Sequence, residues 1–172
     1  MRKVGRKGSN AQSFGGRDDM TDFAGSFEHS ADSKGRVVIP AAYRDGLGEN
    51  FTVTINASAT AIMLYPHERW EREKNRFAQV STTDRKGWAY KRLFIGNAFT
   101  DNSLDAQGRV LLPAKLRTRI GATKDLVFVG MIDVIEVWDA EKYNEVEALT
   151  FEEIEECEQH MEARYPEVSG AQ

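Results

Sequence analysis

The sequence is poor in the residues that close disulfides, bind metals or cross membranes. Its one cysteine, Cys157, excludes an intrachain disulfide and a cluster of thiolate ligands. The histidines His29, His67 and His160 are scattered, without the short spacing of a metal site. No run approaches the roughly 18 apolar residues of a membrane span, and the N-terminus lacks the apolar stretch of a signal peptide. We therefore expect a cytoplasmic protein that has no membrane partner and needs no cofactor or metal.

The sequence also lacks the motifs of common catalytic sites. It contains no G-x-S-x-G elbow, no P-loop and no G-x-G-x-x-G turn. Cys157 stands among glutamates, whereas reactive cysteines sit in electropositive surroundings. These absences predict that the protein is not an enzyme.

The net charge of −4 hides a strong asymmetry along the chain. Residues 133–172 hold 13 acidic and two basic residues, a net charge of −11, whereas residues 1–132 hold 21 basic and 14 acidic residues, a net charge of +7. An acidic tail on a basic body is compatible with DNA binding, because affinity depends on local phosphate contacts rather than on total charge.

What is present above all is an internal repeat. The stretch SADSKGRVVIPAAYRDGLG from Ser30 recurs as SLDAQGRVLLPAKLRTRIG from Ser103, with nine identities at an offset of 73 residues. This period is too long for a solenoid unit and indicates two copies of one small unit. Each copy is too small to bury a good core alone, so we expect the two copies to pair their sheets and share one core. Such a pseudo-two-fold domain presents two equivalent basic turns, which suits a repetitive partner such as duplex DNA.

Each copy predicts the same order of elements, namely a hairpin-like pair of strands, a short helix, two strands and another helix. The β-branched run after Arg36 predicts a strand that ends at Pro40, and glycine ends the helix that follows. Beyond the strict repeat, Tyr65 aligns with Trp138 and Trp70 with Tyr143. Trp70 and Phe77 are expected on one side of the helix after the fourth strand.

These patterns divide the chain into five segments. We expect a disordered basic arm over 1–22, a first repeat over 23–80, a linker helix over 81–95, a second repeat over 96–149 and an acidic C-terminal helix or tail over 150–172. The arm is interpreted either as a DNA-gripping tail or as residues outside the native protein. Thr82 or Thr83 is expected to cap the linker helix. The acidic helix carries only a thin apolar stripe, so we expect it to dock weakly or fray.

The two D-x-x-G-R loops of the repeat are the candidate functional site. Arginine can grip phosphate oxygens or pair with guanine, which makes the following residues candidates for DNA binding: Lys34, Arg36, Gln107 and Arg109. Aspartate can bond backbone amides within a turn and glycine allows a positive φ, so the following residues are expected to structure the loops: Asp32, Gly35, Asp105 and Gly108. The alternative is that each Asp–Arg pair is an internal salt bridge that only stabilises its turn. The repeated Arg44 and Arg117 are expected on a solvated helix face or as struts to an acid.

The repeated D-x-x-G-R-[hydrophobic]₃-P-A block, with the segments LYPHERWE and RLFIGNA, resembles the MraZ family of bacterial transcriptional regulators over about residues 23–149. The resemblance implies an α+β fold, a duplicated AbrB-like swapped-hairpin (looped-hinge) β-barrel with short helices. It also implies a homo-oligomeric ring of about eight to twelve subunits. In this family, DNA contact is associated with D-x-x-x-R loops, which correspond to Asp32–Arg36 and Asp105–Arg109. Gln107 stands where the first copy has Lys34, so the two loops are expected to contribute unequally.

The function implied by the resemblance is sequence-specific binding of double-stranded DNA at promoter direct repeats. The implied target is the division and cell-wall (dcw) operon, including the protein's own gene, so the protein is expected at the nucleoid. The alternative is an antitoxin-like DNA-binding module whose acidic C-terminal segment also binds a protein partner.

Overall fold

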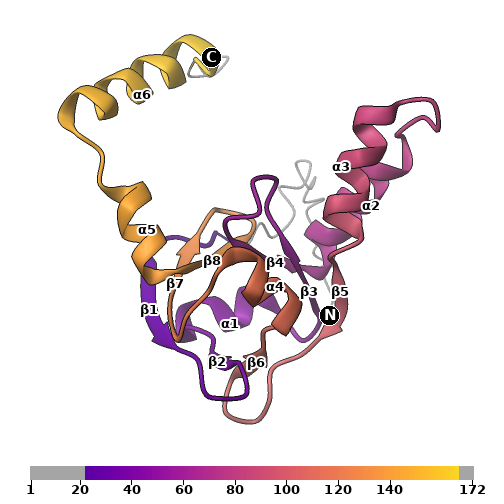
Figure 1. Ribbon diagram of the computed structural model, residues 1–172, viewed down its shortest axis with the longest axis vertical. Helices are drawn as coiled ribbons and strands as arrows, with labels where there is room; N and C mark the ends of the chain where they lie inside the picture. Colours follow the sequence, from indigo (N-terminus) through magenta and orange to yellow (C-terminus); the bar gives the residue numbers. More distant parts are fainter. Residues whose placement is uncertain (1–21, 167–172) are drawn as a thin grey trace, which may run out of the picture.

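The computed structural model describes residues 22–166 as an α+β protein in which one order of elements occurs twice (Figure 1). The first copy comprises β1 (Ser26–Ser30), β2 (Arg36–Val38), α1 (Ala41–Leu47), β3 (Phe51–Ile55), β4 (Ile62–Pro66), α2 (His67–Ala78) and α3 (Arg85–Ile95). The second copy comprises β5 (Phe99–Asn102), β6 (Arg109–Leu111), α4 (Ala114–Ile120), β7 (Asp125–Gly130), β8 (Ile135–Asp139), α5 (Ala140–Glu147) and α6 (Phe151–Arg164). The order predicted from the repeat is confirmed. The predicted arm over 1–22 lies almost wholly outside the described residues.

The main sheet is built by exchange of strands between the two copies. It has six antiparallel strands in the order β1-β7-β8-β4-β3-β5. The first strand of each copy pairs with the third strand of the other, because β1 pairs with β7 and β5 with β3. At the centre, β4 pairs with β8, which places Leu64 opposite Ile135. The second strands, β2 and β6, form a separate two-stranded ribbon. Neither copy therefore holds a complete sheet of its own.

One hydrophobic core lies between the sheet and the helices α1 and α4, and both copies contribute to it. Equivalent positions of the repeat are buried in both copies, among them Val37 and Val110, Ile39 and Leu112, and Leu47 and Ile120. Each large aliphatic side chain buried in this way stabilises the fold by about 1.5–3 kcal/mol. The expectation of a shared core is confirmed.

The helices α2 and α3 cover the outer face of the first copy's strands. All five residues of β3 are buried, and the hydroxyl of Thr54 donates to the carbonyl oxygen of Phe94 in α3 at 2.8 Å. Trp70 and Phe77, predicted on one side of their helix, are both buried there with Phe94. A second hydrophobic cluster thus fastens the helical pair to the sheet.

The N-cap of α3 lies one or two residues after the positions predicted for it. Asp84 is the N-cap, and its side chain accepts a hydrogen bond from the amide of Gly87 at 2.9 Å. The prediction of Thr82 or Thr83 is therefore wrong. The hydroxyl of Thr83 bonds instead to that of Ser81 at 2.9 Å, and a carboxylate is also the better partner for the positive end of a helix dipole.

The corresponding surface of the second copy is left open. The predicted alignment holds in space, because Tyr65 meets Trp70 with ring centroids 5.8 Å apart and Trp138 meets Tyr143 at 6.3 Å. In the first copy, the ring of Phe94 in α3 stacks on the ring of Trp70, with the ring centroids 5.7 Å apart. Within residues 22–166 the second copy places no such helix over Trp138, which remains half-buried.

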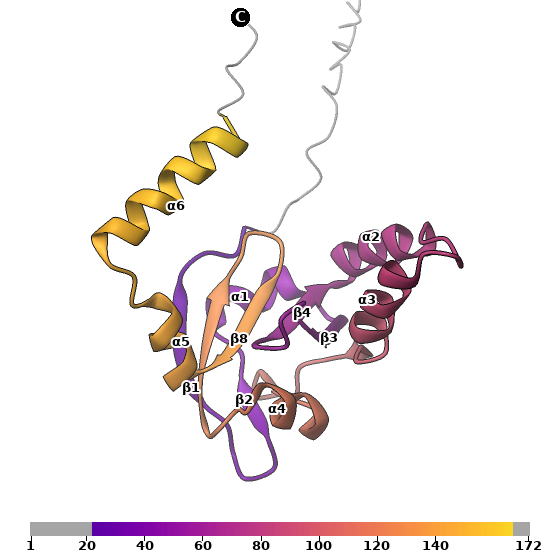
Figure 2. The same ribbon diagram turned by 45° about the horizontal axis from the view of Figure 1, so that its top comes forward.

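The helix α6, the counterpart of α3, extends away from the sheet (Figures 1 and 2). Its start is well defined, because Thr150 and Glu153 form a complete capping box. Every residue of α6 is nevertheless exposed, and Phe151 retains 92% of its accessible surface. We expected α6 to dock weakly or fray. Within residues 22–166 it forms a helix that does not pack on the rest of the chain.

Two reciprocal contacts between the copies explain the glycines of the D-x-x-G-R loops. Gly35 and Gly108 have positive φ values of 84° and 71°. A Cβ on Gly35 would lie 2.6 Å from the guanidinium carbon of Arg117, and one on Gly108 would lie 2.6 Å from that of Arg44. Each arginine thus lies on the loop of the other copy while its Nε donates to a carbonyl oxygen, that of Ile39 at 2.9 Å for Arg44 and that of Leu112 at 3.0 Å for Arg117. Arg44 and Arg117 are therefore struts, but to backbone and not to an acid.

We predict that Gly35→Ala destabilises the protein more than Gly25→Ala does. The two glycines have similar positive φ values, 84° and 90°, but a Cβ on Gly25 would meet only the ring of Phe27, at an ordinary 3.7 Å. Gly25→Ala should therefore lower the free energy of unfolding by about 1 kcal/mol through φ alone, and Gly35→Ala by about 2 kcal/mol, because the guanidinium of Arg117 must also leave its bond to the Leu112 carbonyl oxygen. Chemical denaturation measures both, and equal losses would contradict the close approach. When both glycine substitutions are repeated in an Arg117→Ala protein, their losses of unfolding free energy should become more nearly equal.

Candidate nucleic-acid interface

The β2–β6 ribbon brings the two predicted loops together at one end of the molecule (Figure 1). The strands are antiparallel, with Val37 opposite Val110 at the centre of the register. The amide of Ile39 donates to the carbonyl oxygen of Gly108 at 2.9 Å, and that of Leu112 to the carbonyl oxygen of Gly35 at 3.0 Å. The repeat is therefore related by an approximate two-fold axis through the middle of this ribbon.

Burial of the two valines decides which way the arginines face. Val37 and Val110 are 1% and 2% exposed, so one face of the ribbon lies on the core. Because side chains alternate along a strand, Arg36 and Arg109 share the outer face. The register places Arg36 opposite Leu111 and Arg109 opposite Val38, so the two arginines are diagonal neighbours, whose Cα atoms lie roughly 7–8 Å apart in such ladders.

In the first loop, Asp32 holds both the turn and the arginine. One carboxylate oxygen accepts from the amides of Lys34 and Arg36, each at 2.9 Å. The other accepts from Nε of Arg36 at 2.7 Å. Backbone bonds close the turn, since the amide of Gly35 donates to the carbonyl oxygen of Asp32 at 2.9 Å. The side chain of Arg36 is consequently fixed at its Nε, close to the backbone.

The second loop repeats this geometry with one change. Asp105 accepts from the amides of Gln107 and Arg109 at 2.9 Å and from Nε of Arg109 at 2.8 Å. In addition, a terminal nitrogen of Arg109 donates to the side-chain oxygen of Gln107 at 3.2 Å. Lys34, at the matching position, makes no side-chain bond or ion pair to any residue within 22–166. The two loops therefore have the same backbone and different charges, formally +1 for the first and 0 for the second.

The sequence left two interpretations of the Asp–Arg pairs open, and the geometry is compatible with both. The aspartates bond Nε, as an internal salt bridge would. The terminal nitrogens of Arg36 have no bond within the described residues, and one of those of Arg109 is likewise free there. The aspartates thus leave the outward ends of both guanidinium groups available to an acceptor.

The protonation of the aspartates is set by the same bonds. Hydrogen bonds from the backbone of Arg36 hold the pKa of Asp32 below its usual value, with smaller effects from the Arg36 side chain and the Lys34 amide. The amide and side chain of Arg109 lower the pKa of Asp105 in the same way. Groups with a lowered folded-state pKa stabilise the fold above their unfolded pKa, and this is lost as the pH falls through the folded value. Both loops therefore keep their ion pairs throughout the range above about pH 5.

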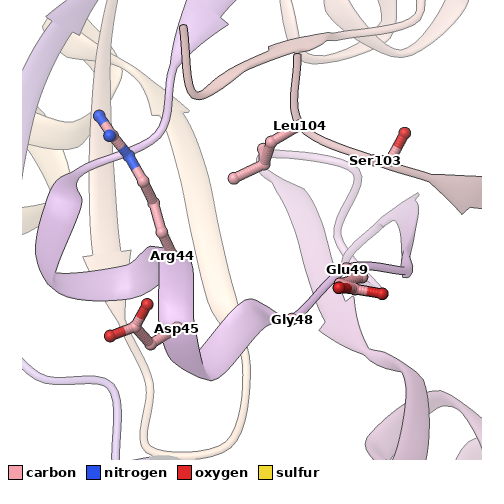
Figure 3. A pocket seen from close by; sticks show the side chains of 6 residues that line it. All are labelled: Arg44, Asp45, Gly48, Glu49, Ser103 and Leu104. Atoms are coloured by element: carbon pink, nitrogen blue, oxygen red, sulfur yellow. The ribbon is translucent and has the colours of Figure 1, made fainter. Parts of the chain in front are cut away.

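An open pocket adjoins the second loop. An open pocket of about 420 Å³ lies between α1 and the start of the second loop, lined by Arg44, Asp45, Gly48, Glu49, Ser103 and Leu104. Figure 3 shows the Arg44 guanidinium directed away from the Asp45 carboxylate, although the two residues are adjacent in α1. Within residues 22–166, no three His, Cys, Asp or Glu side chains are placed to hold a metal ion. In that same range, no helix has the length and apolar character needed to cross a membrane.

We predict that Arg36→Ala leaves the pKa of Asp32 below its usual value. The largest cause of the lowering is a backbone N–H, which the substitution retains. The carboxyl carbon of Asp32, followed by NMR through an acid titration, should shift only part of the way toward an ordinary aspartate. A complete return would mean that the guanidinium, and not the turn, holds the carboxylate.

Comparison with known proteins agrees with the repeat. The family model described as "MraZ protein, putative antitoxin-like" matches the chain twice, over residues 23–93 and 94–164. The Transcriptional regulator MraZ of Lachnoclostridium phytofermentans is 34% identical over 139 residues, which cover 81% of this chain and 94% of the relative. Proteins of the same name are 38% identical in Natranaerobius thermophilus, over 71% of this chain and 84% of that one, and 39% identical in Symbiobacterium thermophilum, over 70% and 86%. The chain belongs to the MraZ family.

Proposed function

We propose that this chain is a sequence-specific DNA-binding transcriptional regulator that places its β2–β6 ribbon in the major groove. The observation that carries the proposal is the pair of aspartate-held arginines, Arg36 and Arg109, on the outer face of that ribbon. The major groove of B-DNA admits a two-stranded β-ribbon, and the terminal nitrogens of arginine pair with O6 and N7 of guanine. Lys34 supplies a further charge for phosphate, and Gln107 supplies a polar side chain in its place.

The aspartates contribute by positioning and not by contact with DNA. Each fixes the inner part of an arginine side chain before DNA arrives, so less side-chain freedom is lost on binding. Asp32 and Asp105 with Gly35 and Gly108 therefore structure the loops. Because the carboxylates are occupied by amides and Nε, they present little free negative charge to phosphate.

The relatives named Transcriptional regulator MraZ support the regulatory part of the proposal. We assign the chain to promoter direct repeats of the division and cell-wall operon that includes its own gene, which places it in the cytoplasm at the nucleoid. We further propose that the exchanged strands form a swapped-hairpin barrel and that the barrels assemble into a homo-oligomeric ring of about eight to twelve subunits. Several subunits bound to adjacent repeats raise the effective concentration of each ribbon, so few contacts per subunit suffice.

A second candidate function is an antitoxin-like module that binds DNA through the same ribbon and a protein through its acidic end. The antitoxin-like description of the matching family and the full exposure of α6 favour it. A stoichiometric partner of different sequence, retained by the intact protein and lost when α6 is altered, would support this second function.

We predict that Arg36→Ala and Arg109→Ala each weaken binding to DNA from upstream of the protein's own gene by about 10–100-fold, since one bidentate guanine contact contributes about 1–3 kcal/mol. Fluorescence anisotropy against a scrambled duplex at two salt concentrations measures the effect. Arg72→Ala is the matched control, because Arg72 is exposed on α2 and has no ion pair within the described residues. Normal binding by both loop variants would refute the site.

We also predict that the difference between the loops is a difference in salt dependence. Lys34→Gln should reduce the slope of log affinity against log salt by about one, and Gln107→Lys should increase it by about one, because each change removes or adds one phosphate contact. The preference for the native duplex over the scrambled one should change little. If the slope of log affinity against log salt is unchanged in both variants, neither position 34 nor position 107 contacts DNA.

A further inference from the structure

We infer that the acidic helix α6 of one copy docks on the outward face of α3 of a second copy, so that copies join head to tail. The inference rests on the homo-oligomer of the proposed function and identifies the contact that builds it. It does not depend on the DNA contacts of the ribbon. Three features carry it, namely the composition of α3's outer face, the composition of α6, and their positions in the molecule.

The outward face of α3 is a basic groove with an aromatic floor. A groove of about 710 Å³ is lined by Thr82, Arg85, Lys86, Trp88, Ala89 and Arg92. At 100° per residue, Arg85, Trp88, Ala89 and Arg92 form one stripe, opposite the side that packs Phe94 against α2. None of the stripe's cations forms an ion pair with a residue within 22–166.

Trp88 gives this groove an aromatic surface beside its cations. Its side chain is half-buried, lines the groove, and carries the ammonium of Lys91 4.9 Å from its ring centroid. The indole N–H is already covered by residues of its own copy, so a docked partner meets the ring and the neighbouring cations and not this donor.

The helix α6 has the complementary composition. One stripe along it carries Phe151, Ile154, Met161 and then Tyr165, all exposed, with Glu158 and Glu162 within the same stripe. Isolated helices of about 12–15 residues are marginal in water, so a helix of this length with no tertiary packing needs a partner to contribute stability. The stripe supplies apolar side chains for Trp88 and carboxylates for Arg85 and Arg92.

The helix cannot reach this groove within its own chain. Figures 1 and 2 both place α5 and α6 on the opposite side of the sheet from α2 and α3. Folding back onto α5, as α3 does onto α2, is disfavoured because α5 itself carries Glu141, Glu145 and Glu147. The contact must therefore join two copies through different surfaces, and a heterologous contact of this kind generates a ring when its rotation closes.

The test measures the mass of the full-length protein by light scattering after size exclusion, over a range of concentrations. Glu158→Lys with Glu162→Lys should raise the dissociation constant of the assembly at least tenfold, as should Arg85→Glu with Arg92→Glu. The two pairs combined should restore assembly by exchanging the charges. Glu152→Lys with Glu156→Lys is the matched control, since it makes the same charge change at the same spacing on the opposite face of α6 and should leave the mass unchanged.

Several results would overturn the inference. They are an unchanged mass in the Glu158/Glu162 variant, no restoration in the combined variant, and a wild-type protein that stays monomeric at every concentration. Loss of DNA binding without loss of mass in the Arg85/Arg92 variant would assign α3 to DNA instead. A monomer that holds a different protein through α6 would favour the antitoxin-like function. Failure of the ribbon is separable, because Arg36→Ala should weaken DNA binding at unchanged mass.

Discussion

The structure depends on one reciprocal interaction, in which each copy of the repeat completes the loop of the other. Arg44 lies on Gly108 while Arg117 lies on Gly35, so close that a Cβ on either glycine would displace the guanidinium group. The carbonyl oxygens of the same two glycines accept backbone bonds across the β2–β6 ribbon, from the amides of Ile39 and Leu112. This contact explains why the arginine and the glycine both recur in the repeat. They are nine residues apart within each copy, but each arginine meets the glycine of the other copy.

The candidate site follows from this constraint with few further assumptions. Once the ribbon is fixed, burial of Val37 and Val110 turns Arg36 and Arg109 outward, since strand residues alternate between faces. The aspartates then decide how the arginines project, because they bond Nε and leave terminal nitrogens free. The packed valines on one face of the ribbon and the outward arginines on the other are thus two results of one alternation.

The order of elements, the shared core and the positions of the two loops could be predicted from the sequence. Each depends on a local sequence pattern, and each pattern occurs in both copies. It could not decide whether Asp32 braces a turn or an arginine, and the structure shows that one carboxylate does both. The strand exchange was beyond local pattern, since it joins residues as distant as Ser30 and Asp125. The cap at Asp84 and the detachment of α6 depend on competition between neighbouring groups, which periodicity alone does not describe.

Because both copies lie in one chain, a substitution can change one copy and leave the other unchanged. A symmetric dimer of a single repeat carries every substitution twice, so its two faces cannot differ. Here Lys34 and Gln107, and likewise α3 and α6, occupy equivalent places with different chemistry. The covalent link holds the shared core together at any concentration, while each half changes alone. The molecule therefore has a direction along its pseudo-two-fold ribbon. Under the proposed function, that direction distinguishes one orientation of a DNA site from the other.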